Sequence, residues 1–157
     1  MGLILRGFNE SYEQYLVLRG YDPSANKLLI LKRALIDSWA EPGFHRFWQV
    51  WNPGIGHLLF RLYLLLGGNR LQLIATMLVF ALCGLMHDVL VMVMFRRPFV
   101  AFTVAFSLFG LFAVANRAVE NRLHQERWPG LLNLTANVSL LAASIYSAVQ
   151  LQKALFP

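Results

Sequence analysis

A histidine and an aspartate stand side by side inside a long apolar stretch, and they are the residues best placed to do chemistry. The stretch is Leu71–Phe95, LQLIATMLVFALCGLMHDVLVMVMF, and the pair is His87 and Asp88. A helix that spans a bilayer needs about 20 apolar residues, and ionisable groups at that depth are costly enough to suggest a function. A neutral imidazole can take a proton from a hydroxyl. We predict that His87 faces a reacting group within a membrane; a histidine bonded to a polar neighbour in a helix bundle fits the sequence equally well.

The residues before His87 leave room on the same face of the predicted helix. Cys83 and Gly84 precede it by four and three positions, so all three lie on one side. Gly84 would let another backbone or a substrate approach that side closely. Nothing cationic in the sequence activates a thiolate, so Cys83 is predicted to be a small packing residue.

Asp88 points about a quarter-turn away from His87 on such a helix. We therefore predict a structural role for its carboxylate, paired with an arginine such as Arg61 or Arg70 from another segment. A small transport protein would instead use the two neighbours as a proton relay.

A second polar candidate, Asn52, lies at a break in an aromatic-rich stretch. The stretch is Phe44–Leu66, FHRFWQVWNPGIGHLLFRLYLLL. Its proline and glycines deny it a continuous hydrogen-bond ladder, so we expect a broken, re-entrant or interfacial pair of helices. Trp48 and Trp51 favour the membrane interface. The Asn52 amide can hold a carbonyl oxygen or orient a ligand, although an asparagine before proline is more often a turn or helix cap.

Shorter elements must position these two stretches. Residues 1–43 are predicted to be interfacial, with a helix at Lys27–Trp39 whose basic side chains extend to the headgroups; an ordinary core-packing helix fits this segment as well. The turn at Gly67–Arg70 can bind an anion through backbone N–H groups, although a simple turn is commoner. A polar loop or short helix is expected at 116–129. The predicted spanning helices are 71–95, 99–115 and 130–155.

The composition places the chain in a membrane. Its 157 residues are 57% hydrophobic and 14% charged, with a mean hydropathy of +0.52, whereas soluble domains are about 45–50% apolar and about 25% charged. The net charge is +6, and the charged residues cluster in the segments between the apolar runs. This distribution fits anionic headgroups better than nucleic acid. One cysteine excludes an internal disulfide, and the histidines lack metal-ligand spacing. We predict an all-α membrane protein, a single domain over 1–157, with about three spanning helices and a broken aromatic segment at 44–70.

The basic residues predict an orientation. With three spans, the segment up to Arg70 and the loop after the second span share one side and together hold eleven lysines and arginines. The other side holds three: Arg96, Arg97 and Lys153. The positive-inside rule then places the N-terminus in the cytoplasm and the C-terminus outside.

The order of three short motifs resembles the membrane-bound O-acyltransferase (MBOAT) family. The motifs are FWxxWN at 47–52, YxxxGGNR at 63–70 and CGLMH at 83–87. In that family an aromatic segment ending in Asn or His precedes a Gly-Gly-Asn-Arg turn in many bacterial members, and a spanning helix then carries the catalytic histidine. The resemblance covers about residues 44–91, so we expect the catalytic-motif region of the family.

The resemblance implies transfer of an acyl group from a thioester donor to a hydroxyl within the membrane, with no bound cofactor. His87 would be the general base and Asn52 would position the acceptor or steady the oxyanion. Trp48, Trp51, Cys83 and Gly84 are expected to contact substrate. Acyl-CoA or an acyl carrier protein would be the donor, and the bacterial inner membrane the location. Expected partners are membrane lipid and either a second copy or a larger membrane protein, without nucleic acid; the alternative function is a non-catalytic subunit that stabilises a partner.

Overall fold

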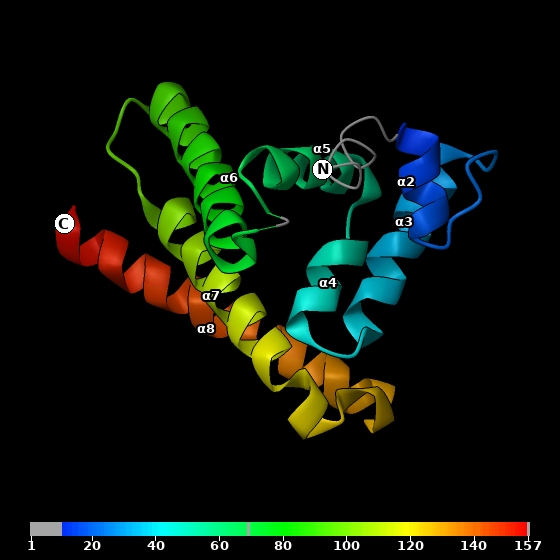
Figure 1. Ribbon diagram of the computed structural model, residues 1–157. Helices are drawn as coiled ribbons and strands as arrows, with labels where there is room; N and C mark the ends of the chain where they lie inside the picture. The colour runs from blue at the N-terminus through cyan, green and yellow to red at the C-terminus, as the bar shows by residue number, and fades with distance from the viewer. Residues whose placement is uncertain (1–10, 69, 157) are drawn as a thin grey trace.

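The computed structural model describes residues 11–68 and 70–156, and within them it contains helices and no strand. The prediction of an all-α fold is confirmed. The α-helices are α2 (Tyr12–Leu18), α3 (Lys27–Asp37), α4 (Phe44–Val50), α5 (Pro53–Leu65), α6 (Gln72–Phe95), α7 (Ala101–Leu123) and α8 (Gly130–Leu155), with 3₁₀ turns η1 (Ser38–Ala40) and η2 (Gln125–Arg127) (Figure 1).

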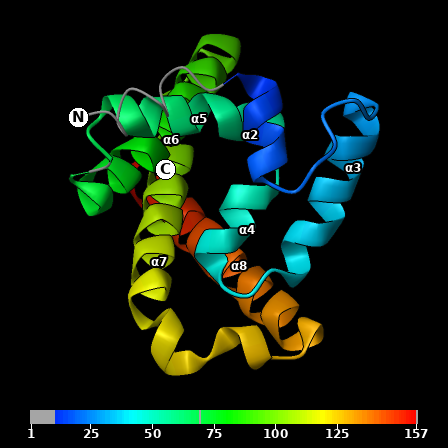
Figure 2. The same ribbon diagram turned by 45° about the vertical axis from the view of Figure 1, so that its right-hand side comes forward.

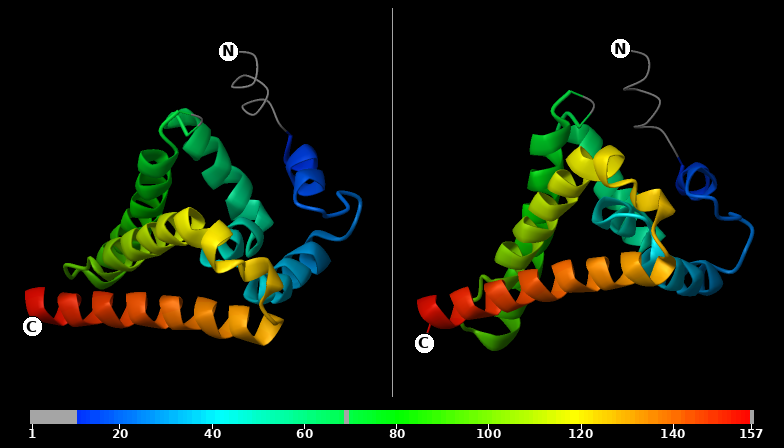
Figure 3. Two further views of the ribbon diagram at one scale, coloured as in Figure 1. Left: turned by 60° about the horizontal axis from the view of Figure 1, so that its bottom comes forward. Right: turned by 90° about the horizontal axis from the view of Figure 1, so that it is seen from below.

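Among the described residues, three helices are long and apolar enough to cross a membrane: α6, the first 19 residues of α7, and α8. The three predicted spans are therefore present, and the chain has the helices of an integral membrane protein. The α6–α7 contact is the most extensive in the fold. Figure 3 shows α5 and α6 diverging from the turn that joins them, with α8 along the opposite edge.

The second span is longer than the sequence predicted. The helix continues from Ala115 to Leu123, where a loop or short helix was expected. The polar residue Asn116 is accommodated because its carboxamide bonds to two side chains, His45 and Gln125, at 3.0 Å each. The prediction at 116–129 is thus corrected: the helix runs on through its polar end, and only a 3₁₀ turn separates it from α8.

The predicted break in the aromatic segment is confirmed. α4 ends before the Asn52-Pro53 step, and α5 begins with Pro53 in its first turn, where the missing proline N–H costs nothing. The following turn is a Schellman motif: the Gly68 N–H donates to the Tyr63 carbonyl at 2.9 Å, and that of Gly67 to the Leu64 carbonyl at 3.1 Å. Gly67 has φ +78°, which glycine adopts without strain. Of the Gly67–Arg70 turn, Asn69 lies outside the described residues.

Small side chains let α4 and α8 pack closely on α7. Ala101, Ala105 and Ala113 recur at multiples of four along one side of α7 and are buried with Phe109 between them. Phe44 of α4 and Ala148 of α8 join the same cluster. Because lipid supplies no hydrophobic driving force between spans, such close contact is what holds helices together in a bilayer.

Candidate functional site

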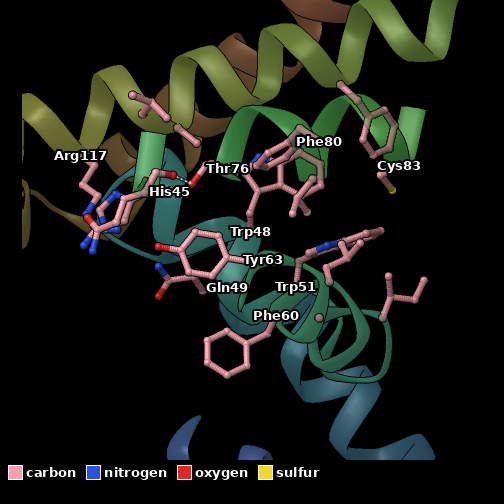
Figure 4. Close-up of a pocket in the computed structure, with 18 of the residues that line it drawn as sticks. His45, Trp48, Gln49, Trp51, Phe60, Tyr63, Thr76, Phe80, Cys83 and Arg117 are labelled. Carbon is pink, nitrogen blue, oxygen red and sulfur yellow. Dashed lines mark hydrogen bonds between the residues drawn. The ribbon is translucent and has the colours of Figure 1, made fainter. Parts of the chain in front are cut away.

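A cavity of about 410 Å³ lies between the aromatic helices α4–α5 and the paired helices α6–α7. On α6 its wall follows one helical side, at Gln72, Thr76, Val79–Phe80, Cys83 and His87. On α7 the wall runs from Phe106, beside the His87 ring, to Arg117. Figure 4 shows Arg117 and His45 at one end, Trp48 and Phe80 in the middle, and Cys83 at the other end. The cavity therefore has a polar end and an apolar end.

His87 is held so that one ring nitrogen has no hydrogen-bond partner among the described residues. Its Nδ1 lies 2.7 Å from the backbone carbonyl oxygen of Cys83. Because a carbonyl only accepts, Nδ1 carries the hydrogen in this bond, and the neutral ring then has a lone pair on Nε2. The ring stacks on Phe106 at 5.2 Å between centroids and tilts against Phe102 at 5.4 Å. The side chain is exposed in this chain and lines the cavity, so Nε2 belongs to an oriented and accessible imidazole.

The aromatic helix α4 supplies the cavity's middle. Trp48 packs edge-on against Phe80 of α6 at 5.3 Å between centroids, and tilts against Phe109 of α7 at 5.0 Å. It also meets Trp51 edge-on at 5.6 Å. The buried Trp48 Nε1 has no hydrogen-bond partner among the described residues. Trp48 is therefore held by its ring contacts, and these place two tryptophans on the cavity wall.

The polar end carries guanidinium groups from two distant parts of the chain. Arg19, at the end of α2, donates to the Gln49 carboxamide oxygen at 3.0 Å and lies 5.1 Å from the centre of the Tyr15 ring. Arg117 is exposed. Burial raises the pKa of Tyr63 above its usual range, and the nearby charge of Arg117 opposes this shift. The phenol therefore stays protonated at neutral pH and donates to the Gly68 carbonyl at 2.6 Å.

Four of the six predicted site residues lie together on this cavity: Trp48, Trp51, Cys83 and His87. Asn52 is not on its wall; the carboxamide oxygen accepts from the Ile55 N–H at 3.2 Å and caps α5. The helix-cap alternative for Asn52 thus describes what its side chain does, because the first N–H groups of a helix need an acceptor.

Gly84 also lies elsewhere, in the contact between α6 and α7. A Cβ atom at this position would come within 2.5 Å of the Phe102 carbonyl oxygen and 2.7 Å of the Thr103 Cα. The predicted close approach is therefore made by another backbone. Gly84 is not among the residues that line the cavity, and its contact with substrate stays a prediction.

Asp88 has the structural role predicted for it, with a different partner. Its side chain is 1% exposed, and its two carboxylate oxygens accept from the backbone N–H groups of Phe102 at 2.8 Å and Thr103 at 2.7 Å. The expected arginine is replaced by the first turn of α7, whose N–H groups lack partners within their own helix. Asp88 thus caps the neighbouring helix at the level of the His87 ring.

Residues at the cavity's polar end were not identified from the sequence. Gln72 and Thr76 lie on the same helical side as Cys83 and His87, and this spacing could have indicated that they line the same cavity. Arg117 was assigned to a loop, and nothing in the sequence indicates that Arg19 of α2 would meet the cavity. These contributions depend on long-range packing.

Among the described residues, no group of three His, Cys, Asp or Glu side chains is placed to hold a metal ion. No family model, curated protein or solved structure matches this chain. Function is therefore argued from the cavity and from the motif resemblance.

Proposed function

We propose that this protein transfers an acyl group from a thioester to a hydroxyl within the membrane, with His87 as the general base. The observation that carries the proposal is the hydrogen bond from Nδ1 to the Cys83 carbonyl. This bond leaves Nε2 as the acceptor on an oriented ring at the cavity wall. The order of the three motifs supports the same reaction class.

The proposed reaction follows from this geometry. Nε2 takes the proton of the acceptor hydroxyl as its oxygen attacks the thioester carbonyl carbon. The new C–O bond forms, the C–S bond breaks, and the imidazolium returns its proton to the departing thiolate, so the histidine is regenerated. The apolar part of the cavity, with Trp48, Trp51 and Cys83, would hold the acyl chain. Acyl-CoA or an acyl carrier protein is the proposed donor, and the polar end would take the donor's polar part.

The protein's surroundings belong to the same proposal. We place it in a bacterial inner membrane with the N-terminus in the cytoplasm, since the predicted cytoplasmic side holds most of the basic residues. Lipid would surround α6–α8, and a second copy or a larger membrane protein would complete the assembly.

Substitution of the histidine tests the mechanism. In nanodiscs, His87→Gln should lower the rate of acyl-thioester consumption by a factor of about 10²–10⁴, the usual contribution of a positioned base. The matched control is Met86→Gln, since Met86 is 62% exposed on the same helix turn. Released thiol and acylated product would be measured with long-chain acyl-CoA and lipid hydroxyl acceptors. Wild-type activity in folded His87→Gln protein would overturn the mechanism.

A non-catalytic membrane subunit is the second candidate, favoured by the exposed side of α6. Met86, Leu90 and Val93 are 62%, 60% and 72% exposed along that side, a surface that either lipid or a larger protein could cover. This candidate predicts that the chain co-purifies with a membrane partner and that the purified chain alone has no transferase activity. A proton relay is disfavoured because both Asp88 oxygens are engaged by backbone N–H groups.

A further inference from the structure

The helix α3 has two apolar sides, and only one of them is used by the fold. Ile30 and Ala34 are 5% and 0% exposed and pack with Leu16 and Tyr21 of the α2 region. Figure 2 shows α3 at the edge of the molecule, with α2 and α4 on its inner side.

The opposite side of α3 is apolar and exposed. Leu28 and Leu29 are 73% and 61% exposed, and Leu35 and Ile36, seven residues further on, are 38% and 62% exposed. At 100° per residue these positions fall within one arc of about 120°, opposite Ile30 and Ala34. We call this arc the outer face of α3.

Basic side chains accompany the outer face. Lys32 lies in the middle of the arc and Arg33 at its border, where it pairs with Asp37 at 3.3 Å. Lys32 has no acidic partner among the described residues. A lysine within an apolar arc can lay its stem along hydrocarbon while its ammonium reaches phosphate oxygens.

We propose that α3 lies in the headgroup layer as an in-plane anchor, with its outer face against anionic phospholipid. An amphipathic helix with leucines, an isoleucine and a lysine on its exposed side fits this layer. Self-association through the same face fits less well, because a two-fold contact would bring the two Lys32 ammonium groups together without a carboxylate from the arc. The inference does not depend on acyl transfer.

The anchor would also hold one wall of the cavity. α2 packs on α3 through Leu16, and α2 supplies Tyr15 to the cavity wall, with Arg19 following at its C-terminal end. Lipid contact by α3 would therefore fix the position of this wall relative to the membrane surface.

Site-directed spin labelling of the full chain in nanodiscs tests the anchor. In a Cys83→Ala background, which removes the one native cysteine, labels would be attached at Leu28→Cys and Ile36→Cys. The matched control is Asp37→Cys, next to Ile36 and outside the outer face. We expect the ratio of oxygen to nickel-chelate collision rates to be several-fold higher at positions 28 and 36 than at 37. The ratio should fall when phosphatidylglycerol is replaced by phosphatidylcholine, and Lys27→Gln with Lys32→Gln should remove most of this lipid dependence.

Three results would overturn the inference. The first is a label at position 36 as accessible to the nickel chelate as one at position 37. The second is immobilised labels at both outer positions with low accessibility to oxygen and nickel, because a second copy or another protein would then cover the face. The third is an accessibility ratio that does not depend on anionic lipid. Each measurement uses no substrate, so none is affected by failure of the acyltransferase proposal.

Discussion

Two neighbouring polar side chains of α6 differ in how completely they are hydrogen-bonded. In the α6–α7 junction, Asp88 is buried and both its oxygens accept hydrogen bonds. At the cavity wall one residue earlier, the ring of His87 bonds through Nδ1, and its Nε2 has no hydrogen-bond partner among the described residues. Both acceptor oxygens of Asp88 are thus engaged at the α6–α7 junction, whereas Nε2 of His87 can still accept a hydrogen bond at the cavity wall.

The difference indicates that Asp88 serves the fold, whereas His87 can serve a reaction. A buried polar group without a partner is costly in hydrocarbon, so polar groups that fix a fold tend to be fully bonded. Gln152 of α8 also bonds to the backbone between α6 and α7. Its carboxamide accepts from the Val100 N–H at 2.8 Å and donates to the Pro98 carbonyl at 3.2 Å. A rigid junction then holds Phe102 and Phe106 against the histidine. Nε2 of His87 is the nitrogen that the proposed reaction would use.

The largest effect is expected when the carboxylate of the α6–α7 junction is removed. Asp88→Ala would leave two buried N–H groups without acceptors at the start of α7, and we expect the free energy of unfolding to fall by about 3–5 kcal/mol. Asp88→Asn keeps one acceptor and should lose less. Reversible unfolding in mixed detergent–SDS micelles, followed by far-UV circular dichroism, would measure both variants.

The control for this substitution is Asp37→Ala. Asp37 pairs with the exposed Arg33 of the same helix, and such surface pairs contribute less than about 1 kcal/mol. Equal losses for the two aspartates would contradict the inter-helix cap. In that case Asp88 would become available as a partner for His87.

A second change crowds the junction without removing a hydrogen bond. Gly84→Ala would place a Cβ within 2.5 Å of the Phe102 carbonyl oxygen, and backbone cannot move aside as a side chain can. We expect a loss of about 1–3 kcal/mol, typical of overpacking, measured by the same unfolding assay. Gly110→Ala on α7 is the matched control, since the three atoms nearest to its added Cβ all belong to the Phe80 side chain, at 3.1–3.2 Å. A loss at Gly110 as large as at Gly84 would mean that the close backbone contact is not specific to Gly84.

Sequence reasoning predicted features that depend on local patterns. The three spans follow from long apolar runs, and the break between α4 and α5 follows from an Asn-Pro-Gly step. The partner of Asp88 could not be predicted from a local pattern. It is the backbone N–H groups in the first turn of another helix, and these are present whatever the residue types there. The extension of α7 through Asn116 depends likewise on side chains from α4 and the η2 turn, far away in sequence.

The smallest predicted effect concerns Asn52, which is not on the cavity wall and whose carboxamide oxygen is already engaged in a hydrogen bond. Its carboxamide oxygen caps α5 through the Ile55 N–H, so Asn52→Ala should cost about 0.5–2 kcal/mol of stability. Asn52→Asp keeps the capping oxygen and should cost less. If the Asn52 amide serves only as the cap of α5, the rate of acyl transfer per folded molecule should be nearly unchanged in both variants, in contrast to His87→Gln. A tenfold or larger fall in kcat for folded Asn52→Ala, with an equal fall for Asn52→Asp, would show that the amide takes part in the reaction. Loss of the cap could not explain this result, because Asn52→Asp retains the cap.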